Sequence, residues 1–185
     1  WADLNKDGRE DLILVGEYSP VAIFINLKSG FQRLNSETLD EALGLWRCIE
    51  VIDYDDDGDL DLLLGNLGKN NMLSVSPETP LIISIRDLDK NGSVDPLMFN
   101  SQQNKNGEWD MFPVQFWDNL TQQSPLFRKE FNSYHAFSKA NMKYYLEKEY
   151  LIQDSLLLAK HDTSKWLENL GSNTFKLNTL PDPLQ

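Results

Sequence analysis

The sequence has few basic residues, one cysteine and no long apolar run. Its 17 Lys and Arg stand against 29 Asp and Glu, and the 185 residues carry a formal net charge of −12. The basic residues are scattered, with no run longer than Arg128 and Lys129, so we expect no nucleic-acid partner. No segment approaches the roughly 20 apolar residues that span a bilayer. Cys48 has no second cysteine to pair with, and its place in the apolar run 45–52 predicts a buried thiol.

The composition nevertheless predicts a folded chain. Hydrophobic residues make up 41% and aromatic residues 11%, which is too much for a disordered acidic tail. The chain begins at Trp1, without an initiator methionine or a signal peptide, inside what looks like a motif. We therefore expect a fragment of a longer protein.

The acidic residues gather in three segments that align without gaps. All three fit Asp-x-[Asp/Asn]-x-[Asp/Asn]-Gly-x-x-Asp, with oxygen-bearing side chains at positions one, three, five and nine and Gly at position six. The segments are residues 3–11 (loop 1), 53–61 (loop 2) and 87–95 (loop 3). Asp, Asn and Gly also favour ordinary turns, but turn preference alone does not explain three copies with the same constrained positions.

Calcium chemistry explains this spacing, because Ca²⁺ takes six to eight oxygen ligands and a Gly permits the sharp turn between them. Any residue type can occupy position seven if only its backbone carbonyl binds the ion. The three loops contain no His or Cys, which argues against Zn²⁺, and the multidentate oxygen set favours Ca²⁺ over Mg²⁺. We predict up to three Ca²⁺ ions, with these ligands: Asp3, Asn5, Asp7, Arg9 and Asp11; Asp53, Asp55, Asp57, Asp59 and Asp61; Asp87, Asp89, Asn91, Ser93 and Asp95.

The segments that flank the loops predict strands. An EF-hand needs Glu at position twelve, where this sequence has Leu14, Leu64 or Met98. Residues 47–54, 60–65 and 81–86 are rich in β-branched and apolar residues, so each loop is expected to join two strands. A second repeat relates residues 23–35 to 165–178, and each copy predicts a hairpin with a Gly/Asn turn.

Together the Asp-rich hairpin and the later Asn-x-Gly-x-Phe hairpin resemble the FG-GAP/VCBS repeat of integrin-α-like β-propellers. The stretch 65–70 and the residues Leu167-Glu-Asn-Leu-Gly also resemble bacterial VCBS proteins, common in Bacteroidetes, with ASPIC/UnbV-type modules. This resemblance implies four-stranded blades around an axis, with Ca²⁺ in a hairpin loop of the blade. It also implies an extracellular, cell-surface or outer-membrane-associated location.

The predicted fold class is mainly β, a partial β-propeller of under three blades with a helical insertion. Residues 1–116 hold the repeats and the three loops, 117–150 the insertion, and 151–185 a returning hairpin. Aromatic residues at helical spacing predict the insertion. Pro125 is expected to start a helix that Ser124 caps, and a break between two helices is expected in 132–141. So few blades leave open sheet edges through which chains could pair.

The sequence predicts a non-enzymatic binding or scaffolding segment in which calcium is a structural clip, with a protein or polysaccharide as partner. His135 and His161 lie in no recognisable catalytic motif. The alternative is part of a carbohydrate-active hydrolase or lyase whose catalytic groups lie largely outside this segment. A dockerin-like or thrombospondin-like module is a third reading, although dockerin needs helices after the loop. Trp109 and Trp117 could stack on sugars, but core packing or edge capping is the favoured role.

Overall fold

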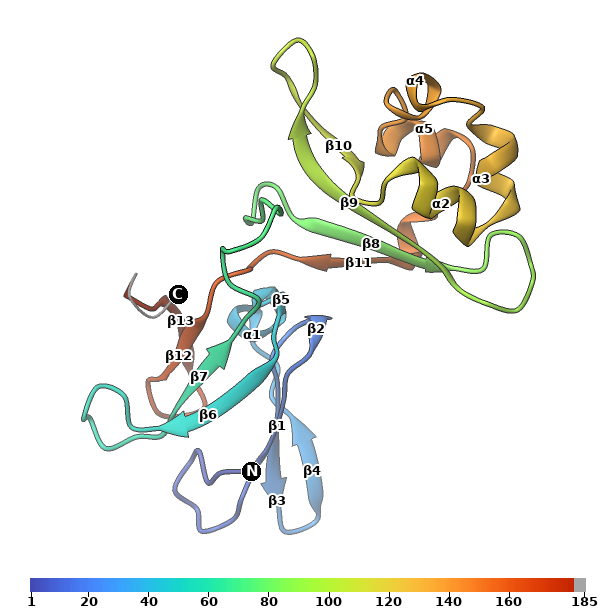
Figure 1. Ribbon diagram of the computed structural model, residues 1–185. Coiled ribbons are helices and arrows are strands. Elements are labelled where there is room, and N and C mark those ends of the chain that lie inside the picture. Colours follow the sequence, from blue (N-terminus) through green and yellow to red (C-terminus); the bar gives the residue numbers. More distant parts are fainter. Residues whose placement is uncertain (182–185) are drawn as a thin grey trace. The chain divides into compact units, whose positions relative to one another are not determined.

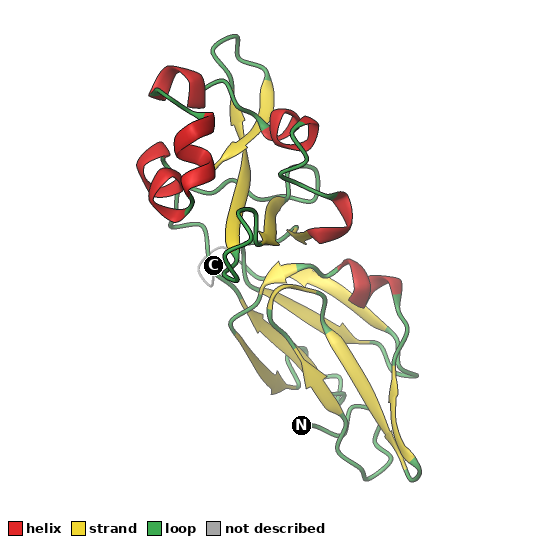
Figure 2. Cartoon of the chain, turned by 90° about the vertical axis from the view of Figure 1, so that its right-hand side faces the viewer, coloured by secondary structure: helices red, strands yellow, loops and turns green. Residues whose placement is uncertain are grey.

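The chain folds mainly as antiparallel β-sheet. The computed structural model describes residues 1–181 apart from the side chain of residue 154. Two compact units make up the chain: unit 1 is Trp1–Met72 with the segment from Ala159 onwards, and unit 2 is Leu73–Leu158. Strands dominate unit 1, whereas most helices belong to unit 2 (Figure 2).

Two blade-like sheets form most of unit 1 (Figure 1). The elements of this unit are β1 (Leu12–Leu14), β2 (Glu17–Ser19), β3 (Ala22–Leu27), β4 (Gly30–Arg33), α1 (Glu37–Glu41), β5 (Gly44–Leu45), β6 (Cys48–Ile52), β7 (Asp61–Gly65), β12 (Lys165–Asn169) and β13 (Phe175–Thr179). The first sheet has the order β1-β3-β4, and the second has the order β13-β12-β7-β6. β2 and β5 form a separate two-stranded sheet.

The two larger sheets have the same plan. In the first sheet, Ala2 forms an antiparallel bridge with Asp11, just before β1. In the second sheet, β6 pairs with β7 in the equivalent position. β1 then corresponds to β7, and the hairpin β3–β4 corresponds to β12–β13. Only residues 15–21 connect β1 to β3, whereas the equivalent connection from β7 to β12 contains all of unit 2. Unit 2 is therefore an insertion within one blade.

Alternating side chains explain why these segments form blades. In β3, Ile23 and Ile25 are buried while their neighbours are partly exposed, as expected for a strand with one face on a core. Leu62, Leu64 and Leu167 from the second sheet join the same hydrophobic cluster. Burial of these side chains supplies the main stabilisation of unit 1.

Unit 2 has one four-stranded sheet and four short helices. Its elements are β8 (Leu81–Arg86), β9 (Asp95–Gln103), β10 (Trp109–Pro113), α2 (Trp117–Gln123), α3 (Pro125–Glu130), α4 (Tyr134–Phe137), α5 (Met142–Glu147), the 3₁₀ turn η1 (Gln153–Ser155) and β11 (Leu156–Ala159). The strand order is β10-β9-β8-β11. Loop 3 joins β8 to β9, just as loop 2 joins β6 to β7.

The helices occur where the aromatic spacing predicts them, but there are more of them than expected. Pro125 lies in the first turn of α3, and the Ser124 side chain accepts a hydrogen bond from the Leu126 amide, as a cap should. The predicted break at 132–141 contains the one-turn helix α4. Phe127, Phe131 and Tyr145 are buried in one cluster, whereas Tyr134 is 56% exposed.

A mainly β, partial β-propeller fold with a helical insertion is thus confirmed. The predicted domain boundaries (1–116, 117–150 and 151–185) were drawn from the sequence repeats and differ from the boundaries of the two compact units. The predicted division stays a prediction. None of the helices within residues 1–181 is long and apolar enough to cross a membrane.

One predicted burial is wrong. Cys48 is exposed because β6 lies at the edge of its sheet, where alternate side chains of the apolar run face outwards. Trp109 is 62% exposed on β10, likewise an edge strand, so it is not packed in the core and edge capping stays its predicted role. Trp117 does pack against the helical cluster, and its indole N–H donates to the Phe131 carbonyl at 3.0 Å.

Candidate metal centre

The three Asp-rich loops share one backbone conformation. At position four a non-glycine residue has a left-handed φ, and at position six the glycine has a positive φ as well. These angles are 58° at Lys6 and 82° at Gly8, 60° at Asp56 and 89° at Gly58, and 59° at Lys90 and 87° at Gly92. Glycine reaches such angles at no steric cost, which explains its recurrence at position six.

The carboxylate at position one holds the turn together in every loop. One of its oxygens accepts the backbone N–H of position five, and the other accepts the N–H of position six. The O···N distances are 3.0 and 2.8 Å at Asp3, 3.1 and 3.0 Å at Asp53, and 3.1 and 2.8 Å at Asp87.

Positions three and five add two further bonds of the same kind. The side-chain oxygen of position three accepts the N–H of position five, at 3.0 Å for Asn5, 3.3 Å for Asp55 and 3.2 Å for Asp89. The side-chain oxygen of position five accepts the N–H of position seven, at 3.0 Å for Asp7, 2.8 Å for Asp57 and 2.7 Å for Asn91. Short polar side chains that bond the backbone two residues ahead are typical of such turns.

Position nine is the most buried part of each loop. Asp11, Asp61 and Asp95 are each at most 2% exposed. One oxygen of each accepts the N–H of position two, at 3.1, 3.1 and 2.9 Å respectively. A buried carboxylate needs such donors, so position nine ties the end of each loop back to its start.

Two asparagines outside the Asp-rich motif complete the loops of unit 1, and neither was among the predicted site residues. The backbone N–H groups of Asn26 and Asn169 donate to the second oxygens of Asp11 and Asp61, at 2.8 Å in both cases. Their side-chain amides also donate to the position-eight carbonyls, Glu10 at 3.0 Å and Leu60 at 3.2 Å. The repeated hairpin could have revealed this role from sequence. In both copies an asparagine lies near the end of the first strand, close to the turn.

Loops 1 and 2 lie next to each other. The buried Asn169 amide also donates to the Leu4 carbonyl of loop 1 at 2.9 Å. Lys6 of loop 1 forms an ion pair with Asp59 of loop 2. The hydrogen bond to Asp59 and the charges of Asp59, Asp57 and Asp53 raise the pKa of Lys6, although desolvation opposes the shift. A cationic side chain thus partly compensates the crowded acids.

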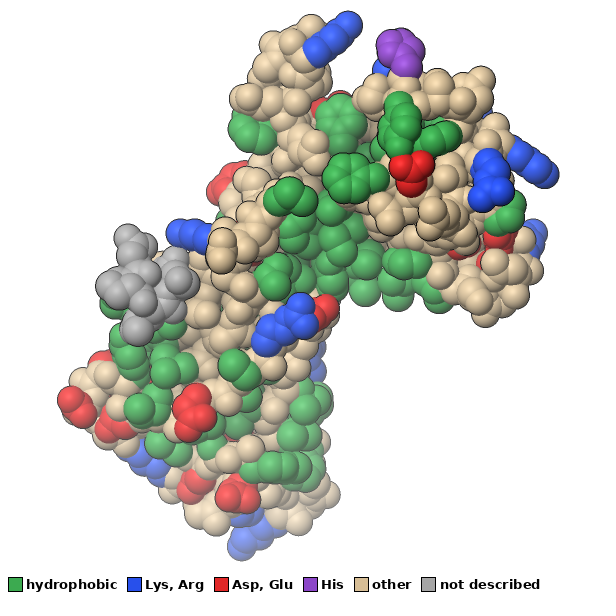
Figure 3. Space-filling model, viewed as in Figure 1, with side chains coloured by type: hydrophobic (Ala, Val, Ile, Leu, Met, Phe, Trp, Pro, Cys, Tyr) green, Lys and Arg blue, Asp and Glu red, His purple; other side chains and the backbone are tan. Residues whose placement is uncertain are grey.

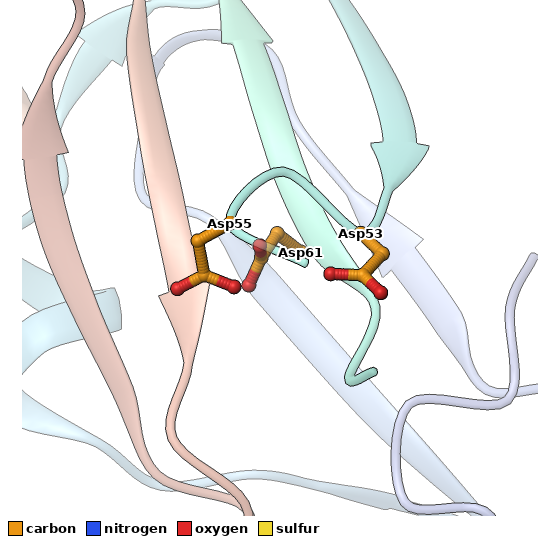
Figure 4. A group of neighbouring side chains, drawn as sticks. All are labelled: Asp53, Asp55 and Asp61. Carbon is orange, nitrogen blue, oxygen red and sulfur yellow. The ribbon is translucent and has the colours of Figure 1, made fainter. Parts of the chain in front are cut away.

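Carboxylates converge in loops 2 and 3. Ligand oxygens of Asp53, Asp55 and Asp61 lie within 4.8 Å of one another, and so do those of Asp87, Asp89 and Asp95. Figure 4 shows the loop 2 side chains turned toward a common region. Desolvation, followed by the charge of Asp57, raises the pKa of Asp55, which is the direction expected where carboxylates crowd without a cation. An all-oxygen set of this kind fits Ca²⁺.

The predicted ligands are not all brought together. Asp57 is outside the loop 2 group of carboxylates, and the Asp7 carboxylate forms an ion pair with Arg9. Loop 1 has an amide, Asn5, at position three, so it cannot present the same three carboxylates. The carbonyls of Arg9, Asp59 and Ser93 stay predicted ligands.

Loop 3 is additionally connected to the helices of unit 2. The buried Ser124 hydroxyl donates to the second oxygen of Asp89 at 2.8 Å. The same hydroxyl caps α3. One side chain therefore holds both the position-three carboxylate of the loop and the first turn of a helix.

Part of the chain that contains loops 1 and 2 resembles a known repeat. Residues 3–64 match the FG-GAP-like repeat model. The FG-GAP-like segment contains loops 1 and 2, all of the first sheet, β6 and β7 as far as Leu64, and it covers about a third of the chain. No similar curated protein and no similar solved structure was found.

Proposed function

We propose that this chain is a calcium-binding β-propeller segment of an exported or cell-surface protein, related to VCBS-repeat proteins. Its role is binding or scaffolding without catalysis, and Ca²⁺ acts as a structural clip in loops 1, 2 and 3. One observation carries the proposal: the same five hydrogen bonds recur in three loops that are far apart in sequence. The FG-GAP-like match supports it for the first two loops.

A structural clip is the role that this geometry supports best. The position-nine carboxylates are buried where each loop meets its outgoing strand, so a bound cation would join the loop to the start of that strand. Three ions would also change the formal charge from −12 to −6, which is an ordinary value for a soluble protein.

Calcium is expected to raise the melting temperature. Extracellular sites of this type have Kd of about 10⁻⁴–10⁻³ M, and a site with Kd tenfold below free calcium adds about 1.4 kcal/mol. Two loops in unit 1 should then raise its melting temperature by about 10 °C between chelator and millimolar calcium. Thermal unfolding followed by circular dichroism measures this. Asp40→Asn removes an exposed acid outside the loops and should keep the full shift, and an unchanged melting temperature would exclude the clip.

A further inference from the structure

Unit 2 contains a polar cavity that is separate from the metal loops. It has a volume of about 710 Å³ and lies between the β9–β10 turn and the α4–α5 segment. The space-filling view shows the hollow between these two parts of unit 2 (Figure 3). Ligand cavities typically measure about 300–1,000 Å³, so this one is large enough for a small oligosaccharide.

The base of the cavity is fixed by a side-chain pair. Asn141 donates from its amide to the Asp110 carboxylate at 2.6 Å. Its amide oxygen accepts the Tyr144 N–H at 3.1 Å and so caps α5. The second Asp110 oxygen accepts the Met111 N–H at 2.8 Å. These bonds hold α5 against β10 and occupy the carboxylate, which is the only acidic group among the described residues that line the cavity.

The walls carry positive charge. Lys105 comes from the β9–β10 turn, and Lys139 follows α4. Both side chains are exposed, and neither forms an ion pair or hydrogen bond with a residue in 1–181. The cavity thus has two ammonium groups against the single Asp110 carboxylate, and in a chain with a net charge of −12 this local excess of positive charge favours an anion.

The walls also carry groups that suit hydroxyls and an apolar ring face. Gln102, on the same face of the sheet as Asp110 and Phe112, and Asn106 present side-chain amides, each with donors and an acceptor, and none of the described residues bonds these amides. Phe112 adds a partly exposed aromatic ring. A simple inorganic anion would need neither the amides nor the ring, and a neutral sugar would not need the lysines.

We propose that this cavity binds a sugar acid, with its carboxylate at Lys105 and Lys139, its hydroxyls on the amides and one sugar face over Phe112. The inference deepens the binding role proposed above but does not depend on calcium in the loops. It names acidic polysaccharide as the partner class.

The test is calorimetric titration of the full chain with a galacturonic acid trisaccharide, in calcium and in chelator. We expect saturable binding that weakens as salt rises. Replacing both cavity lysines (Lys105→Gln with Lys139→Gln) should weaken binding about tenfold, the scale of two exposed ion pairs. The matched control, Lys28→Gln with Lys143→Gln, removes two exposed lysines that do not line the cavity and should leave the affinity unchanged.

Several outcomes would overturn the proposal. The trisaccharide could show no saturable binding, or a neutral galactose trisaccharide could bind equally well. The control variant (Lys28→Gln with Lys143→Gln) could lose as much affinity as the cavity variant, or the cavity variant could keep full affinity; each of these results would contradict the proposal. Binding that needs calcium and ignores the lysines would assign the sugar to the loops and also exclude the cavity. Failure of the calcium clip is distinguishable, because it would leave lysine-dependent binding in chelator intact.

Discussion

Replacing Asp61 with alanine is expected to destabilise unit 1 by about 3 kcal/mol in chelator. Asp61 is 1% exposed and accepts backbone N–H groups from Tyr54 at 3.1 Å and Asn169 at 2.8 Å. Hydrogen bonds to a charged acceptor contribute about 1.5–3 kcal/mol each, and the variant leaves two donors unpaired. Relief of repulsion with Asp53 and Asp55 offsets part of this loss.

Urea unfolding followed by tryptophan fluorescence measures the effect of Asp61→Ala. The control is Asp56→Asn, which also removes one acid from loop 2. Asp56 is exposed, and asparagine tolerates its φ of 60°, so little change is expected. A loss of less than about 1 kcal/mol at Asp61 would contradict the anchoring role given to position nine.

Replacing Phe127 with alanine is expected to destabilise unit 2 by about 4 kcal/mol. Phe127 is fully buried, and its ring lies 6.4 Å from Phe131, 6.3 Å from Tyr145 and 6.0 Å from Tyr150 between centroids. Truncation removes the ring that these three share and leaves a cavity that short helices cannot easily close.

Hydrogen exchange of the β9 and α3 amides measures the Phe127→Ala effect within unit 2. Phe116→Ala is the control, because Phe116 is 68% exposed and its removal should cost little. Unchanged protection in Phe127→Ala would show that the aromatic cluster does not hold the helices to the sheet.

The loops were predictable from sequence because their structure is local. Each places its turn, its left-handed residues and the five shared hydrogen bonds within nine residues, so the spacing of Asp and Gly contains the information. The strands on either side of loops 2 and 3, and the strand after loop 1, were predictable for the same reason, whereas only the Ala2 bridge precedes loop 1. The aromatic spacing also located the helices, but it missed α4, a single turn too short to show a periodic pattern.

Long-range pairing was the part that local pattern could not supply. β12 pairs with β7 although unit 2 lies between them in sequence. The similarity of residues 165–178 to 23–35 gave the hairpin but not the sheet that it joins. The contact of Asn169 with Asp61, and the exposure of Cys48, both follow from that sheet order, so neither could be derived from the neighbouring residues alone.

The number of calcium ions bound per chain tests whether the three loops are metal sites. Equilibrium dialysis at millimolar calcium should give three ions, one for each loop. Asp55→Ala should reduce the count to two, because Asp55 belongs to the converging oxygens of loop 2, while Asp40→Asn should leave it at three. A chain that binds no calcium, or whose count is unaffected by Asp55→Ala, would contradict the assignment of the loops as metal sites.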